Sequence, residues 1–83
     1  MRQERILQGE FPIIGKNIKR LREKKQMRNI DVVTKVQLAG IALSTSTLSK
    51  IERGISNPTT QLLFELTNIL QCDFNTFFEK SKE

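Results

Sequence analysis

The chain has 83 residues, of which 37% are hydrophobic and 28% are charged, and its formal net charge is +5. This length suffices for one small domain, and the composition is that of a folded protein rather than of a disordered chain. With no histidine and one cysteine, Cys72, the sequence excludes an internal disulfide and a zinc site built from Cys and His. It also contains neither a long apolar run that could span a membrane nor the apolar stretch of a secretory signal. We therefore expect a cytoplasmic protein.

The positive charge is concentrated near the N-terminus. Residues 1–28 carry a net charge of +6, residues 29–56 carry +1, and residues 57–83 carry −2. Such a gradient favours an anionic partner, with nucleic acid ahead of a membrane surface. A run such as KRLREKK is more often simply a helix face in water, so the charge by itself does not decide the partner.

The first two helices are predicted from the periodicity of apolar residues. The first spans residues 14–26, and its apolar stripe consists of Ile14, Ile18 and Leu21. The second begins at Asn29, a candidate cap, and stops at Gly40. Its core residues are Val32, Val33 and Val36. These β-branched residues would also suit a strand, but the sequence offers no alternating partner strand, so we predict a helix.

The third helix is predicted within the hydroxyl-rich stretch STSTLSKIERG, residues 44–54, and it ends at Gly54. At 100° per residue, one arc of about 140° is polar and lacks acidic residues. This arc contains Thr45, Ser46, Ser49, Lys50 and Arg53. The core side of the helix contains Leu48, Ile51 and Ile55, with Glu52 at its margin.

The cluster of hydroxyl side chains has two interpretations. Ser and Thr are good caps but weak helix formers, and a cap needs only one of them. A surface helix selected for stability would carry Glu, Lys, Gln or Ala at the other positions. Short side chains that both donate and accept hydrogen bonds suit a helix that lies in a DNA groove. Simple exposure to water is the alternative.

Two more helical segments complete the prediction. The fourth has Ser56 or Asn57 as its cap and Pro58 at its first helical position. Its apolar face consists of Leu62, Leu63, Leu66, Ile69 and Leu70. The last segment, residues 73–80, begins with Asp73 as a cap and carries Phe74, Phe77 and Phe78. By default these aromatic residues belong to the core. Three of them on one short helix occupy more of its circumference than one core face needs, so we expect at least one to be available to a partner.

The order of these elements, the stretch TLSKIERG, the following NP and the upstream LRE resemble the helix-turn-helix family of the lambda and 434 repressors and Cro, the Xre-like regulators. The resemblance runs from Ile14 to Phe78. It implies an all-α protein, a compact five-helix bundle of the lambda-repressor-like type, whose third helix lies in the major groove. We accordingly divide the chain into a loosely attached N-terminal arm (1–12), a DNA-binding domain (13–80) and a C-terminal tail (81–83).

The resemblance also implies a function and residues that perform it. The protein would be a sequence-specific transcription regulator, a repressor, that binds double-stranded DNA as a homodimer without a cofactor, metal ion or small-molecule ligand. Bases would be read by Thr45, Ser46, Ser49 and Lys50. Phosphates would be contacted by Asn29, Ser44, Arg53, Asn57 and Thr59. The resemblance implies the dimer but not its contacts, for which the aromatic residues of the last segment are the candidates: Phe74, Phe77 and Phe78.

Glu52 needs a partner if it lies at the margin of the core, because desolvation disfavours an unpaired carboxylate. Arg22 lies beside the apolar stripe of the first helix, and the resemblance points to the same pair. We therefore expect an ion pair between Arg22 and Glu52. In the alternative, both side chains point to water.

The chain departs from the family pattern between the second and third helices. The spacing from Val33 to Ser44 is longer than usual, which makes residues 37–43, QLAGIAL, an expanded turn. The second helix is then longer, or the turn bulges outward. Val33 also replaces a residue that is commonly small, so we expect a modestly altered packing of the two helices.

Other classes of function fit the sequence less well. An enzyme is not predicted, because the chain has no histidine, no glycine-rich phosphate loop and no carboxylate pair spaced for acid–base catalysis. Cys72 follows an apolar helix and is expected to be a buried, unreactive thiol. The rival interpretation is an antitoxin-like or adaptor module that binds protein, but such a face should present aromatic or aliphatic anchors. A membrane surface is disfavoured because the basic helix lacks a large apolar face.

Overall fold

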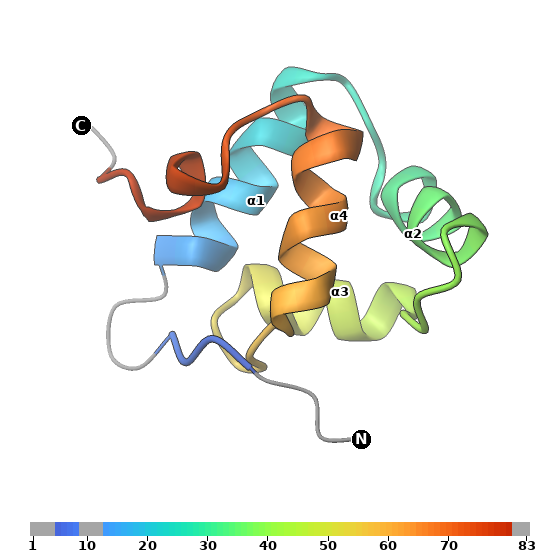
Figure 1. Cartoon of the computed structure of the whole chain (residues 1–83), viewed down its shortest axis with the longest axis horizontal. Helices are drawn as coiled ribbons and strands as arrows, with labels where there is room; N and C mark the ends of the chain where they lie inside the picture. Colours follow the sequence, from blue (N-terminus) through green and yellow to red (C-terminus); the bar gives the residue numbers. More distant parts are fainter. Residues whose placement is uncertain (1–4, 9–12, 81–83) are drawn as a thin grey trace.

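The computed structural model describes residues 5–8 and 13–80, so the predictions for residues 1–4, 9–12 and 81–83 lie outside the described residues. Its elements in chain order are α1 (Ile13–Lys24), α2 (Asn29–Leu38), α3 (Thr45–Glu52), α4 (Thr60–Leu70) and a 3-10 helix, η1 (Phe74–Phe78). Figure 1 shows α4 in the middle of the molecule, with α1 on one side, α2 on the other and α3 across one end. None of the helices in the described ranges is both long and apolar enough to cross a membrane.

One apolar core joins the four α-helices and η1. The predicted stripes of α1 and α2 are buried, as are Leu48 and Ile51 of α3 and most of the apolar face of α4. Phe77 of η1 is fully buried and closes this core at the C-terminal end. Burial of these side chains supplies the main favourable free energy for packing the helices.

α3 begins and ends where the sequence predicts. The backbone N–H of Thr47 donates to Ser44 Oγ (3.1 Å), so Ser44 is the N-cap. Gly54 has a positive φ of 81° and its N–H donates to Ile51 O, which closes the helix. The placement of Ile55 in the core is wrong: its side chain is 61% exposed, because the chain turns away from the core after Gly54.

The starts of α2 and α4 differ from the prediction. α2 is capped by Arg28 rather than Asn29, and the carboxylate of Asp31 accepts from the Arg28 backbone N–H. α4 is capped by Thr59, whose Oγ1 accepts from Leu62 N (3.1 Å), so Pro58 precedes the helix instead of opening it. The Pro58 ring is buried.

The expected fifth α-helix is a 3-10 helix of 5 residues, so the described part of the chain has four α-helices and one 3-10 turn rather than a five-helix bundle. Asp73 precedes η1 but makes no side-chain capping bond. At the other end, Asn17 Nδ2 of α1 donates to the carbonyls of Phe77 and Glu79 (both 2.8 Å). These bonds to α1 satisfy carbonyls that a longer helix would have used, and 3-10 helices are usually short.

The expanded turn folds back onto the domain. α2 ends at Leu38, and Gly40 (φ 85°) reverses the chain so that Ile41 N donates to Val36 O. Leu43 is buried, and its carbonyl accepts from Gln37 Nε2 (2.8 Å). The additional residues therefore form a connection that is anchored to the core at Leu43.

Residues 5–8 are not loosely attached, which corrects the prediction for this part of the arm. Arg5 forms an isolated antiparallel bridge with Thr59, and Ile6 N donates to Pro58 O (2.9 Å). Gln8 is buried. Backbone hydrogen bonds to the loop between α3 and α4 thus hold this segment in place. The local sequence does not reveal that this loop is its partner.

Candidate DNA-binding surface

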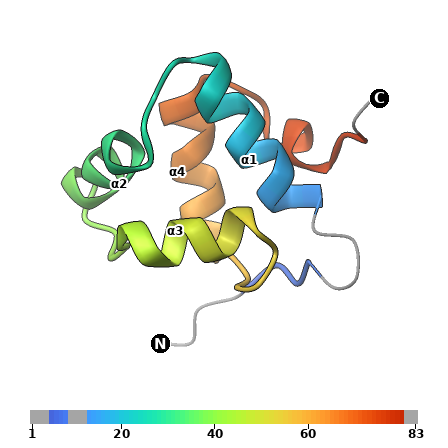
Figure 2. The ribbon, with the colours of Figure 1, turned by 180° about the vertical axis from the view of Figure 1, so that it is seen from behind.

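The outer face of α3 is polar and exposed. Thr45, Ser46, Ser49 and Lys50, the predicted base-reading residues, are all exposed, whereas Leu48, Ile51 and Glu52 on the opposite side of the helix are buried. Figure 2 shows α3 along one edge of the molecule, next to α2. A face of this kind offers short donors and acceptors, one cation and no acid to an adjacent molecule.

Asn29, at the first residue of α2, is bonded to α3. Its Nδ2 donates to the carbonyl of Thr45 (3.2 Å) and to Ser49 Oγ (3.1 Å), so both N–H bonds of the amide are used inside the protein. Its Oδ1 is buried and has no partner among the described residues. A phosphate contact at this position stays a prediction. Because the side-chain donors are used, the donors for such a contact would be the backbone N–H groups at the start of α2.

The N-terminus of α3 is stabilised by its own hydroxyl groups. Ser44 Oγ accepts from Thr47 N and donates to Thr47 Oγ1 (2.9 Å). Ser44 is exposed, beside the first turn of the helix. The helix dipole and the free N–H groups of this turn attract an anion to the position where the resemblance places a phosphate.

Charged residues flank the two helices. Arg28 is exposed and its guanidinium forms an ion pair with Asp31 (3.1 Å). The hydrogen bond from the Arg28 side chain, followed by that from its backbone N–H, lowers the pKa of Asp31. Arg53, at the C-cap of α3, is also exposed, so exposed cations lie at the start of α2 and at the end of α3.

The loop between α3 and α4 contains the other two predicted phosphate contacts. Asn57 and Thr59 are both half-buried. Asn57 Oδ1 accepts from the backbone N–H of Gln8 (3.0 Å), and Thr59 Oγ1 accepts from Leu62 N. The amide nitrogen of Asn57 and the hydroxyl hydrogen of Thr59 remain as donors.

Arg22 and Glu52 form the ion pair expected at the border of α1 and α3. Arg22 Nε donates to Glu52 Oε2 (2.8 Å) and Arg22 Nη2 donates to Glu52 Oε1 (3.0 Å), while Nη1 donates to the carbonyl of Met27. The side chains are only 12% and 5% exposed. The hydrogen bond to Glu52 is the main cause that raises the pKa of Arg22. This pair fixes the C-terminal end of α3 against α1.

The aromatic residues divide between core and surface. Phe77 is fully buried, so a dimer contact through Phe77 is excluded in this fold. Phe78 is 41% exposed, and Phe64 of α4, which the sequence did not single out, is 56% exposed. The ring of Phe74 lies between them, with centroids 4.9 Å from Phe64 and 5.5 Å from Phe78. We call Phe64, Phe74 and Phe78 the aromatic patch.

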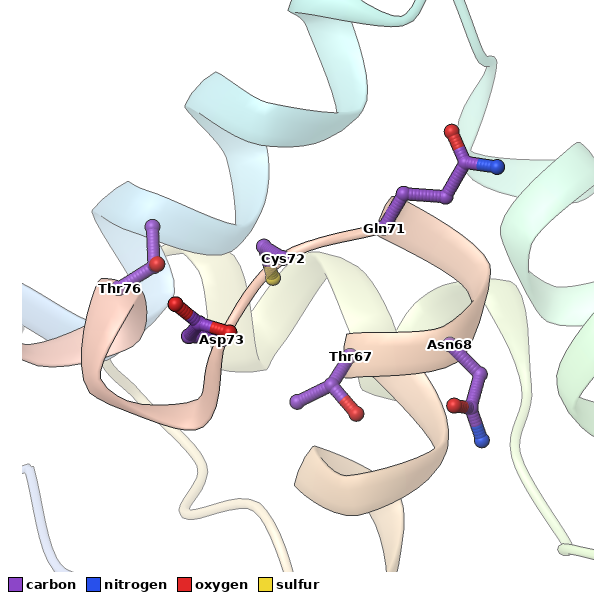
Figure 3. Close-up of a pocket in the computed structure, with 6 residues that line it drawn as sticks. All are labelled: Thr67, Asn68, Gln71, Cys72, Asp73 and Thr76. Carbon is purple, nitrogen blue, oxygen red and sulfur yellow. The ribbon is translucent and has the colours of Figure 1, made fainter.

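Cys72 lies in a shallow depression that opens to solvent between α4 and η1. Figure 3 shows it on the connection between the two elements, with Thr67 of α4 and Asp73 beside it. The thiol is half-buried rather than buried, and burial, followed by the charge of Asp73, raises its pKa. Within the described residues, no group of three His, Cys, Asp or Glu side chains is placed to hold a metal ion.

Sequence reasoning missed Gln8, a buried residue that supports this surface, and Arg28, an exposed residue beside it. Gln8 contacts the loop after α3 although it lies far away in the sequence, and an isolated glutamine carries no signal of such a contact. Arg28 could have been found from its place three residues before Asp31 at the start of α2, a spacing at which opposite charges pair favourably.

Comparisons with known proteins agree with this geometry. The family HTH_3, described as helix-turn-helix, matches residues 18–77. A crystal structure of an HTH_3 family transcriptional regulator from Vibrio cholerae is similar with a TM-score of 0.64 and 31% sequence identity, over 81% of this chain and 35% of that chain. This chain thus spans well under half of that regulator's length. No match was found among curated proteins. Because the family match extends from α1 through η1, the chain belongs to the HTH_3 helix-turn-helix family.

Proposed function

We propose that the protein is a sequence-specific DNA-binding transcription regulator that places α3 in the major groove. The observation that carries this proposal is the exposed, acid-free polar face of α3 on a domain of the HTH_3 family. Thr45, Ser46, Ser49 and Lys50 read base edges, since hydroxyl and ammonium groups match the acceptors and donors displayed there. This role needs no cofactor or chemical catalysis, and its DNA target would place the protein in the cytoplasm.

Phosphate contacts position the domain on the duplex. They come from Ser44 and the N-terminus of α2 at Asn29 on one strand, and from Arg53, Asn57 and Thr59 on the other. The donors are the backbone N–H groups at the starts of α2 and α3, the Arg53 guanidinium, the Asn57 amide and the Thr59 hydroxyl, and such donors suit phosphate oxygens. Their contacts determine register and affinity, and α3 determines sequence preference.

The regulator acts as a homodimer in this proposal. The aromatic patch is the dimer contact, because exposed, clustered aromatic side chains are typical anchors of protein interfaces. A two-fold dimer would recognise two half-sites about 34 Å apart. Bound to a promoter, such a dimer would repress by excluding other proteins from the same DNA.

Selection of bound duplexes from random DNA tests the proposal. We expect enrichment of a motif with two-fold symmetry and an affinity that falls steeply with salt. Lys50→Ala should change the selected motif, whereas Lys24→Ala, at the exposed end of α1, should not. If no motif is enriched at any salt concentration and a protein partner is found instead, the antitoxin-like or adaptor function replaces this proposal.

A further inference from the structure

Gln8 is a buried side chain that joins three elements of the domain. Its Nε2 donates to the carbonyls of Ile51 (3.0 Å) and Ser56 (2.8 Å), and its Oε1 accepts from the backbone N–H of Gly15 (2.9 Å). The amide thus connects the start of α1, the end of α3 and the following loop. A buried amide with both N–H groups and its oxygen bonded is fixed in orientation.

The backbone around Gln8 supports the same loop. Gln8 N donates to Asn57 Oδ1 (3.0 Å), Ile6 N donates to Pro58 O (2.9 Å), and Arg5 pairs with Thr59. Figure 1 shows this segment beside the chain that connects α3 to α4. Residues 5–8 therefore brace the loop that carries the predicted phosphate contacts.

The contact with Gln8 determines which side of the Asn57 amide faces outward. A backbone N–H can only donate, so the Asn57 atom that faces Gln8 N is the oxygen. The NH₂ group then points the other way, and in the described part of the chain it donates to no protein atom. Asn57 is half-exposed, so this donor is accessible to an acceptor outside the protein.

We propose that Gln8 is a positioning residue for DNA binding, which keeps the donor side of Asn57 turned toward a phosphate oxygen. Its side chain holds the segment against α1, α3 and the loop, and its backbone N–H orients the Asn57 amide. Gln8 itself is buried and does not touch DNA. The inference rests on the proposed function, in which Asn57 contacts the DNA backbone.

The inference predicts a distinctive pattern of affinities. An amide is neutral, so its contact with phosphate releases no counterion and adds little to the salt dependence. It also carries no sequence information. Loss of the contact should weaken binding to every duplex by the same factor, about tenfold, while the salt slope and the preferred motif stay unchanged.

The test compares Gln8→Ala with the unchanged protein in the full chain. Dissociation constants are measured for the selected motif and for an unrelated duplex over a salt series, at a temperature where circular dichroism shows both proteins folded. We expect the uniform loss described above. Unchanged affinity would overturn the inference, since Gln8 would then serve stability alone. A loss confined to the selected motif would overturn it too, because Gln8 would then orient α3.

A double-mutant cycle supplies the control. In the Gln8→Ala background, Asn57→Ala should cause no further loss, because the contact is already gone. Gln37→Ala is the matched control, since the amide of Gln37 braces the other loop through Leu43 O. Any loss of DNA affinity caused by Gln37→Ala should add to the loss caused by Asn57→Ala. Additive effects of Gln8→Ala and Asn57→Ala would contradict the inference.

Asn57→Asp tests the same orientation without changing the buried amide, should Gln8→Ala fail to fold. The aspartate keeps an oxygen toward Gln8 N but replaces the outward donor by a second oxygen, so it should bind DNA more weakly than Asn57→Ala. Binding equal to that of the unchanged protein would overturn the inference. If the unchanged protein binds no duplex DNA at all, the proposed function fails, which is a different outcome.

Discussion

Arg22 and Glu52 join α1 to α3 through two hydrogen bonds in a nearly water-free site. Because each charge is largely desolvated, removal of one partner leaves the other uncompensated. We expect Arg22→Ala and Glu52→Ala each to lower the free energy of unfolding by about 2 to 4 kcal/mol. Urea unfolding of both single variants and of the double variant measures this. The double variant should lose much less than the sum, and additive losses would show that the two side chains do not interact.

Gly15 lies where the backbones of α1 and α3 are in direct contact. A Cβ at this position would clash with the carbonyl oxygen of Ile51, which is backbone and cannot turn away. Gly15→Ala should therefore force the helices apart and lower the free energy of unfolding by about 3 kcal/mol, although alanine is the better helix former. Thermal unfolding tests this against Lys16→Ala, a neighbouring exposed position, which should be near neutral. Stability equal to that of the unchanged protein would mean that α1 and α3 are not this close.

Asp31 makes the start of α2 sensitive to acid. Its folded-state pKa lies below the ordinary value because Arg28 stabilises the carboxylate. A group with a lowered pKa stabilises the fold fully above its unfolded pKa, about 4, and this contribution is lost as the pH falls through the folded value. Asp31→Asn should thus be less stable than the unchanged protein at pH 6, and the difference should shrink as the pH falls through the lowered pKa of the folded state. A difference that is independent of pH would contradict the ion pair.

Ser49 is expected to determine base preference. Its hydroxyl accepts from Asn29 and lies on the exposed face of α3, so its hydrogen is available to a base acceptor. Ser49→Ala should weaken discrimination at one or two base pairs by roughly 1 to 3 kcal/mol while the fold is retained. Selection of bound DNA measures the motif, and Thr67→Ala removes a hydroxyl on α4 as the control. The same motif for the Ser49 variant and the unchanged protein would refute base reading by this residue.

The thiol of Cys72 should react slowly. Burial and the neighbouring charge of Asp73 raise its pKa, which lowers the fraction of thiolate near pH 8. Alkylation by iodoacetamide should accordingly be slower in the folded protein than in 8 M urea. Equal rates in the two states would show that the thiol is fully open to water.

Local patterns in the sequence account for much of the domain. Apolar spacing predicts five helices, and the first four are α-helices in the structure, whereas the fifth is a 3-10 helix. Ser44 and Gly54 mark the ends of α3, because capping acts within one or two turns. The polar face of α3 and the pairing of Glu52 with Arg22 also follow from positions on a helical wheel. The family resemblance adds the arrangement of these helices, which the match to HTH_3 confirms.

Only the tertiary structure determines the contacts between segments that are distant in sequence. Gln8 braces the loop after α3, Asn29 uses both amide hydrogens on α3, and Phe77 rather than Phe78 is buried. The C-terminal segment is a short 3-10 helix, and Asn17 of α1 binds the carbonyls of Phe77 and Glu79 at its end. The sequence by itself therefore determines which segments are helical and which face of α3 is polar. The orientation of each polar side chain on that surface depends on hydrogen-bond partners that folding brings together, and those partners have no fixed spacing along the chain.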